Sequence, residues 1–339
     1  MDQDLLDKLA AMPDSPAKAD LMTKMGSELR DGDPKQGAEL CRQALALSKR
    51  LDYTQGKADS LGILSACELL TAEHRKALGH ARQSLYLLES LGDRFKVDRI
   101  RILIASIQRH MGDYQQAAAS YREVRQAAQA SGDQLLEASA LNNLGIIYQN
   151  LGDMAAAMDH YRQGLELYRA IGETRFVAVG LINIAEILRQ TKDFSKALEH
   201  CLQALGIFVE YGDRSGEASA RHIAGRLYQD LGDQARSIEE LELGIAIAKE
   251  IGDADNEISI LVSCAQILIS QGRAEQAIGI LKRAHQMAQD KLDKKYLVMI
   301  YESYAEAYHQ LGDIPQTMWY RSRQQELEQE LKGQKVDDQ

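Results

Sequence analysis

The chain has 339 residues, of which 45% are hydrophobic, and it carries 40 basic against 50 acidic side chains. The hydrophobic share argues against intrinsic disorder. The net charge of −10 argues against nucleic acid or an anionic membrane as the main partner. The long stretch between Pro34 and Pro315 contains no proline, which favours an all-α protein.

The N-terminal segment, residues 1–12, is expected to form a helix that caps the exposed end of a helical stack. It has acidic residues where a signal peptide needs basic ones, and no uncharged stretch of the chain is long enough to cross a bilayer. The cysteines Cys41, Cys67, Cys201 and Cys264 lie far apart without a CxxC pair, which indicates a reducing compartment. We therefore expect a cytoplasmic protein without membrane insertion.

From residue 13 onward, a two-residue turn signal returns every 40 residues. The first series contains Gly32-Asp33, Ala72-Glu73, Gly112-Asp113, Gly152-Asp153, Lys192-Asp193, Gly232-Asp233, Gly272-Arg273 and Gly312-Asp313. A second series, 20 residues out of phase, contains Leu51-Asp52, Gly92-Asp93, Gly132-Asp133, Gly172-Glu173, Gly212-Asp213, Gly252-Asp253 and Leu292-Asp293. Glycine ends a helix in the left-handed conformation and aspartate caps the next one, so each repeat is predicted to be two antiparallel helices.

A motif inside the repeat is more specific. The best copy reads Leu141-x2-Leu144-Gly145-x2-Tyr148, followed by Ala157-x3-Tyr161. This pattern resembles the tetratricopeptide repeat. The period is 40 residues instead of 34, and the tryptophan and proline of the family pattern are missing. In these features the repeat resembles the long-repeat branch of the family, which is found in Pins-type adaptors, kinesin light chains and bacterial regulators.

The resemblance covers residues 13–331 and implies a right-handed superhelical solenoid of about eight antiparallel helix pairs. First helices would line its concave side and second helices its convex side. Residues 332–339 are expected to form a polar tail. Small residues at fixed positions of both helices, such as Gly145, Gly225 and Ala157, would let the helices approach closely.

No catalytic or phosphate-binding motif occurs in the sequence, which together with a solenoid predicts a protein that is not an enzyme and needs no cofactor. His160 and His200 stand one repeat apart and would suit a zinc pair. Polar positions on the convex face explain them better, and we expect no metal site. Glu186 with His222 is the only acid–base pair the groove offers.

In tetratricopeptide repeats the ligand-contacting residues occur at fixed positions of the first helix, so the resemblance implies which residues of this chain face the groove. The candidate peptide-binding residues are Arg109, Asn142, Asn143, Gln149, Asn183, Glu186, Arg189, His222, Arg226 and Gln229. Asparagine can bond an extended backbone, and arginine pairs with carboxylates in a bidentate fork. Because three of the candidates are arginines, we expect a protein or peptide ligand with acidic groups.

The equivalent positions of the first two repeats are small or apolar: Met22, Leu29, Gly62, Ile63, Ala66, Leu69 and Leu70. They could form a pocket for an apolar anchor of the ligand, or they could be covered by the N-terminal helix folding inward. The second interpretation is favoured, since such patches are commonly buried within the same chain.

The leading functional hypothesis is a non-catalytic scaffold or adaptor that holds a partner peptide or helix in the concave groove. The alternatives are the sensory or regulatory region of a bacterial signalling protein that controls a cyclase, kinase or DNA-binding output domain, and a peptide receptor. The charged C-terminal helix expected before residue 331 suggests the regulatory alternative, because it could lead into a further domain. The partner, the oligomeric state and the presence of an output domain do not follow from the sequence.

Overall fold

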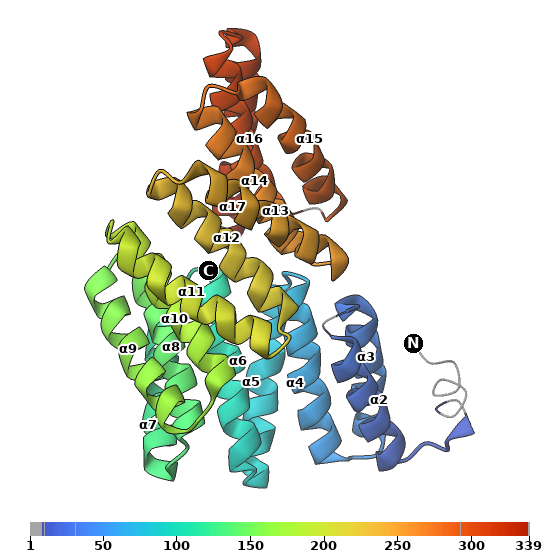
Figure 1. Ribbon diagram of the computed structural model, residues 1–339. Coiled ribbons are helices and arrows are strands. Elements are labelled where there is room, and N and C mark those ends of the chain that lie inside the picture. The colour runs from blue at the N-terminus through green and yellow to red at the C-terminus, as the bar shows by residue number, and fades with distance from the viewer. Residues whose placement is uncertain (1–8, 10, 31, 292, 338–339) are drawn as a thin grey trace. The chain divides into compact units, whose positions relative to one another are not determined.

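The computed structural model describes residues 9, 11–30, 32–291 and 293–337, and the side chains of these residues up to Leu331. In this part of the chain sixteen helices follow one another and no strand occurs, which confirms the all-α prediction (Figure 1). The helices are α2 (Pro16–Leu29), α3 (Pro34–Arg50), α4 (Thr54–Leu70), α5 (His74–Leu91), α6 (Arg94–Met111), α7 (Tyr114–Ser131), α8 (Gln134–Asn150), α9 (Met154–Ala170), α10 (Thr174–Gln190), α11 (Phe194–Glu210), α12 (Arg214–Asp230), α13 (Gln234–Glu250), α14 (Ala254–Ser270), α15 (Ala274–Asp290), α16 (Lys294–Gln310) and α17 (Ile314–Asp337).

The helices end and begin where the turn signals predict. Gly152 has φ 82°, in the left-handed region, and the side chain of Asp153 accepts a hydrogen bond from the backbone N–H of Ala156 in the next helix. The same device joins α12 to α13, where Gly232 has φ 84° and Asp233 caps the following helix. The glycine thus reverses the chain and the aspartate satisfies an N–H that the helix cannot.

Three turns keep this geometry without glycine. Asp52, Ala72 and Lys192 have φ of 51°, 60° and 64°. A left-handed residue with a side chain costs about 1–2 kcal/mol. Packing of the flanking helices therefore imposes the turn at these positions, where the sequence signal is weak.

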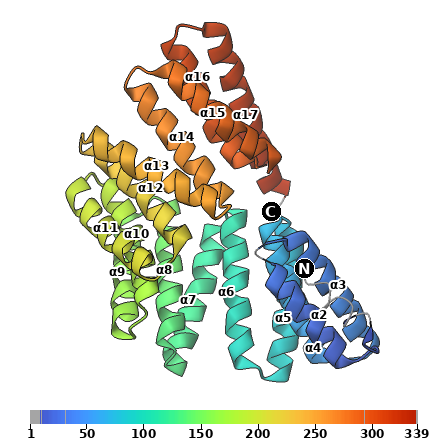
Figure 2. The same ribbon diagram turned by 45° about the vertical axis from the view of Figure 1, so that its right-hand side comes forward.

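The helices form two compact units, residues 1–152 (unit 1) and residues 153–337 (unit 2). Within each unit every described helix packs against the next one in the chain, from α2 to α8 and from α9 to α17. In unit 2, α15 packs against α16, and α16 packs against α17 (Figure 2). The result is the stack of helix pairs that a tetratricopeptide-type solenoid requires.

Small residues in the predicted columns sit at the closest contacts between helices. A Cβ placed on Gly225 of α12 would lie 2.6 Å from Cγ of Leu241 in α13. Ala157 and Ala197 occupy the equivalent column of second helices and are fully buried. These contacts supply the physical reason for the small residues that the repeat pattern shows.

First helices also contact one another within a unit. In unit 1, α2 contacts α4 and α4 contacts α6; in unit 2, α10, α12, α14 and α16 form a similar series. Each unit therefore has a face built from first helices, which we call the first-helix face. Several of the residues at the predicted groove positions lie on it.

The predicted segments at the two ends of the chain can be compared with the structure in part. The predicted capping helix, residues 1–12, lies largely outside the described residues; of its described part, Leu9 is buried among the side chains between α2 and α3. At the other end α17 continues to Asp337, so residues 332–337, expected as a polar tail, are helical. No helix in the described ranges has the length and apolar character needed to cross a membrane.

Candidate functional site: the first-helix faces

On unit 2, the predicted residues of α10 and α12 meet in one ionic cluster. Arg189 donates two hydrogen bonds to the carboxylate of Glu186, at 3.0 and 3.2 Å, and a third to Asp230 at 3.3 Å. The guanidinium of Arg226 lies 3.9 Å from the carboxylate oxygen Oε2 of Glu186. Residues one repeat apart in the sequence are therefore paired across neighbouring first helices.

The charges of this cluster are balanced within the protein. Burial acts to raise the pKa of Glu186, but the hydrogen bonds from Arg189 and the charge of Arg226 hold this pKa below its ordinary value. Burial lowers the pKa of Arg226. Because Glu186 and Asp230 already neutralise Arg189 and Arg226, the two arginines offer less to an acidic ligand than the sequence suggested.

His222 lies beside this cluster and is tied to the next repeat. Its Nε2 is 2.7 Å from the hydroxyl oxygen of Ser263 in α14. Burial, reinforced by the positive charge of Arg226, lowers the pKa of His222 to about 4. The imidazole is therefore neutral at physiological pH and bonded to serine, while Glu186 is bonded to arginine, so the two are not arranged as an acid–base pair.

The other predicted residues follow the same register. Asn183 of α10 and Gln229 of α12 are half-buried on unit 2, and the side-chain oxygen of Gln229 is buried without a hydrogen-bond partner among the described residues. On unit 1, Asn143 of α8 donates to the carbonyl of Ser139 at 2.9 Å. Arg109 of α6 donates toward the ring of His110 at 3.4 Å.

Asn142 and Gln149 of α8 are half-buried, and each makes an interaction within the protein, as Asn183 does. The ten candidates thus fall into two sets. Four lie on α6 and α8 of unit 1, and six lie on α10 and α12 of unit 2. The structure brings Glu186, Arg189 and Arg226 into direct contact.

A cavity of about 540 Å³ opens on the first-helix face of unit 1. Its lining comes from α2, α4 and α6, with two residues of α5. Part of the lining comes from α4, with Gly62, Ile63 and Ala66. Two or three periods of 40 residues later, the equivalent positions are those of Asn142, Asn183 and Glu186, respectively. The cavity is therefore lined by residues at predicted groove positions, and it stays open because two of these residues have small side chains.

The floor of this cavity depends on Gly62. A Cβ at this position would come within 2.9 Å of Cδ1 of Ile100 and 3.3 Å of the hydroxyl of Ser84. Glycine thus lets Ile100 of α6 approach α4 and close the floor with an apolar side chain. Phe95, five residues earlier on α6, also lines the cavity and is 68% exposed.

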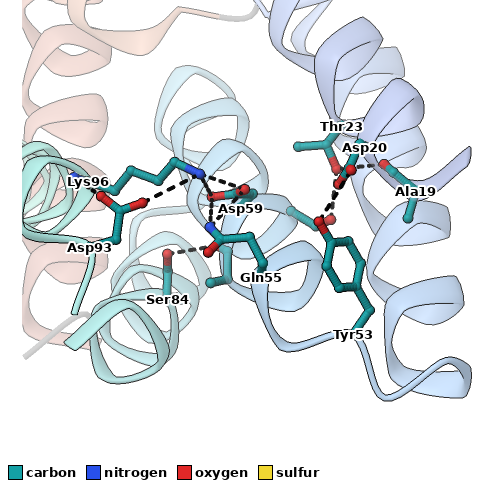
Figure 3. A network of polar contacts seen from close by, with 11 residues as sticks. Ala19, Asp20, Thr23, Tyr53, Gln55, Asp59, Ser84, Asp93 and Lys96 are labelled. Atoms are coloured by element: carbon teal, nitrogen blue, oxygen red, sulfur yellow. Dashed lines mark hydrogen bonds and ion pairs between the residues drawn. The ribbon is translucent and has the colours of Figure 1, made fainter. Parts of the chain in front are cut away.

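Polar side chains edge the cavity and tie its three first helices together (Figure 3). Lys96 of α6 donates to both carboxylate oxygens of Asp59 in α4, at 2.8 Å each, and Gln55 donates to the same carboxylate at 3.0 and 3.1 Å. On the side of α2, the hydroxyl of Tyr53 donates to Asp20 at 3.2 Å. These bonds fix the carboxylates before any ligand arrives.

Only some of the apolar positions predicted in the first two repeats reach this cavity. Gly62, Ile63 and Ala66 do, whereas Met22 and Leu29 pack into the core between α2 and α3. The remaining two positions are Leu69, which packs with the core of α5 and α6, and Leu70, which is 55% exposed. The predicted cover, the N-terminal helix, lies outside the described residues except for its end.

The polar residues of this cavity were not among the predicted positions. Lys24 and Asp59 lie in the first two repeats, where only small and apolar positions were considered, and Lys96 lies on the first helix of the third repeat. Asp59 precedes Arg99 by one period of 40 residues, so the two residues occupy the same position of their repeats. Both side chains line the cavity.

Elsewhere, the histidines and cysteines behave as structural residues. In the ranges that the structure describes, no group of three or more His, Cys, Asp or Glu side chains is placed to hold a metal ion. Burial lowers the pKa of His200 and raises that of Cys201 to about 12. Cys41 and Cys67 are buried in the core of unit 1.

The stacked helix pairs agree with a comparison of the sequence with protein families. Residues 98–170 and 176–250 match the family model described as tetratricopeptide repeat. The chain is a tetratricopeptide-repeat protein. Residues 256–310 of this tetratricopeptide-repeat protein also match the model described as anaphase-promoting complex subunit 5.

Solved structures with the same fold include bacterial regulators. The apo form of the quorum sensor NprR from B. thuringiensis is 13% identical with a TM-score of 0.68, over 96% of this chain and 91% of NprR. The Rap conjugation gene regulator of plasmid pLS20, solved with a peptide, is 13% identical with a TM-score of 0.67, over 95% of this chain and 97% of its own.

A third structure, aspartyl phosphate phosphatase F from Bacillus subtilis, is 14% identical with a TM-score of 0.66, over 86% of this chain and 75% of its own. No curated protein sequence matches the chain significantly. At these identities the likeness establishes the tetratricopeptide-repeat fold. One relative binds a peptide and another is a phosphatase, so the choice between binding and catalysis depends on the site itself.

Proposed function

We propose that this tetratricopeptide-repeat protein is a non-catalytic adaptor that binds a segment of a partner protein, or a free peptide, on its first-helix faces. The observation that carries the proposal is the cavity on α2, α4 and α6. It lies in the register where repeats of this kind present side chains to a ligand, and its volume of about 540 Å³ is in the range of sites for small ligands or a few side chains.

The unit 2 cluster supports a binding role more than a catalytic one. Its acid, Glu186, is held ionised by Arg189 and Arg226, and its histidine is held neutral by burial and bonded to Ser263. Neither group has the pKa near neutrality that efficient proton transfer requires. Half-buried amides and ions at fixed positions suit hydrogen bonding to an extended backbone.

The second candidate is a peptide receptor that controls a regulatory event. The observation in its favour is the fold shared with NprR, described as a quorum sensor, and with the plasmid regulator solved with a peptide. Another relative is a Rap protein complexed with competence and sporulation factor. The receptor hypothesis predicts that a short free peptide suffices, whereas the adaptor hypothesis predicts that it binds more weakly than the partner protein containing it.

The test is selection of a displayed library of random dodecapeptides on the immobilised full chain. The matched variants are Ala66→Arg, which places a long side chain in the cavity, and Ala119→Arg, the same change on the exposed face of α7. We expect peptides enriched on the wild type and on Ala119→Arg to be lost from Ala66→Arg, with equal helicity of all three by circular dichroism. Enrichment that survives Ala66→Arg, or no enrichment at all, refutes binding at this cavity.

A separate assay addresses catalysis. Acetyl phosphate is a small acyl phosphate, chemically related to the substrate that the name of the phosphatase relative implies. We expect no release of phosphate above the spontaneous rate. Release by the wild type that Ala66→Arg or Glu186→Gln abolishes would contradict the non-catalytic part of the proposal.

A further inference from the structure

The unit 1 cavity combines an apolar floor with a basic edge. Ile63 and Ala66 of α4 and Ile100 and Leu103 of α6 supply apolar surface. The charged side chains in its lining are four basic and two acidic: Lys24, Arg30, Lys96, Arg99, Asp20 and Asp59. The excess of positive charge is notable because the whole chain has a net charge of −10.

The two carboxylates are already engaged by groups of the protein. Asp59 accepts from Lys96 and Gln55, and Asp20 accepts from Tyr53. Lys96 therefore has its counter-ion in place at 2.8 Å. Lys24 and Arg99, which also line the cavity, are not bonded to these two carboxylates.

Lys24 and Arg99 are exposed cations on opposite helices of the cavity, α2 and α6. Lys24 lies 3.9 Å from Glu28, and both side chains are more than half exposed, so this ion pair is weak. The guanidinium of Arg99 lies over the ring of Phe95, 5.7 Å from its centre. A ring contact leaves the N–H groups in the plane of the guanidinium able to bond a carboxylate.

We propose that the cavity takes a peptide segment in which a bulky apolar side chain is flanked by acidic residues. The apolar side chain rests on Ile63, Ala66 and Ile100 beside Phe95, and the flanking carboxylates pair with Lys24 and Arg99. This inference rests on the proposed binding function and adds the chemistry of the ligand. It assigns the acidic preference to unit 1, whereas the arginines of the unit 2 cluster are neutralised by their own neighbours.

The composition of the selected peptides tests the inference separately from the function. We expect peptides that bind the wild type, and are lost from Ala66→Arg, to carry Phe, Leu, Ile or Met with Asp or Glu within two positions. Peptides that bind at the cavity but are neutral, basic or without an apolar anchor would overturn the inference and leave the binding function standing. Absence of any enriched peptide would overturn both.

Charge reversal supplies the quantitative test with one selected peptide, labelled and measured by fluorescence anisotropy. The double variant Lys24→Glu with Arg99→Glu is expected to bind about tenfold more weakly, since two exposed attractions become repulsions. The control double variant, Lys35→Glu with Arg82→Glu, makes the same change at exposed positions outside the cavity and is expected to keep the wild-type affinity within about twofold. Equal losses in both variants, or no loss in the first, would overturn the inference.

The remaining occupant to test is the chain itself, because residues 1–8 read MDQDLLDK and combine acidic with apolar residues. A chain lacking these residues is expected to bind the selected peptide with unchanged affinity. Binding that occurs only after their removal would assign the cavity to the N-terminal segment and overturn the proposal of an external ligand.

Discussion

The same glycine-to-alanine change is expected to have opposite effects at two positions of unit 2. Gly206 lies in the exposed interior of α11, and Gly232 lies in the turn after α12 with φ 84°. A Cβ added at either position would meet no heavy atom within 4 Å. Side-chain packing therefore makes no difference between them, and the backbone conformation alone decides.

The magnitudes follow from the two conformations. In a helix interior, alanine is about 1 kcal/mol more favourable than glycine, so Gly206→Ala should raise the free energy of unfolding by about this amount. In the left-handed region a Cβ costs about 1–2 kcal/mol, of which about 0.4–1 kcal/mol is offset by the smaller entropy of the unfolded chain. Gly232→Ala should therefore lower the free energy of unfolding by about 1 kcal/mol.

Lys192 offers the reverse experiment in the same unit. It holds φ 64° with its side chain exposed, so Lys192→Gly removes left-handed strain and should stabilise by up to about 1 kcal/mol. The assay is urea denaturation of the full chain followed by far-ultraviolet circular dichroism. If Gly206→Ala and Gly232→Ala shift the midpoint in the same direction, the assignment of these turns to backbone conformation is refuted.

Three further predictions concern packing and charge in unit 2. Gly225→Ala should lower the free energy of unfolding by about 1–3 kcal/mol, since its Cβ would lie 2.6 Å from a packed leucine; a neutral effect in urea denaturation contradicts the close contact. Glu186→Gln should cost about 1–3 kcal/mol at neutral pH, with Glu199→Gln, an exposed position on α11, as the neutral control. The pKa of Glu186 is lower in the folded than in the unfolded chain, so its ionised carboxylate stabilises the fold fully above the ordinary pKa of glutamate. This stabilisation is lost as the pH falls through the folded pKa. The difference in unfolding free energy between Glu186→Gln and the wild type should therefore become smaller in acid. The pKa of His222 is about 4 in the folded chain, so its imidazole should stay neutral well below the ordinary pKa of histidine, and its protonation should favour unfolding in acid. An NMR titration of His222 with a midpoint near 6.5 would show that burial does not control its pKa.

The repeat period indicated which first-helix residues lie near one another, but not which of them pair across repeats. The period placed Glu186, Arg189 and Arg226 on one face, as observed, but it suggested that the arginines await an acidic ligand. The structure instead gives them partners in the chain, with Arg189 bonded to Asp230 across the neighbouring first helix at 3.3 Å. Partners one repeat away are close only after stacking, so a reading of one repeat at a time does not find them.

The cavity of unit 1 was partly predicted from the sequence. The small residues Gly62 and Ala66 indicated an opening, and the favoured interpretation covered it with the N-terminal helix. Packing decided which apolar residues reach the cavity: Met22 lies in the core between α2 and α3, whereas Ile63 lines the cavity. A helical period gives the face of a residue to within about one position, which is too coarse to separate these outcomes.

What the sequence determined by itself is the repeat: the 40-residue period, the antiparallel helix pairs, and the turns made by glycine and aspartate. These are local properties, because one or two residues decide each turn and the spacing of apolar residues decides each helix. What only the tertiary structure decided is how the side chains of neighbouring repeats pair, at Lys96 with Asp59 and at Arg189 with Asp230, and where a cavity stays open. Those outcomes depend on distances of a few ångströms between residues about 40 positions apart, and such distances exist only once the helices are stacked.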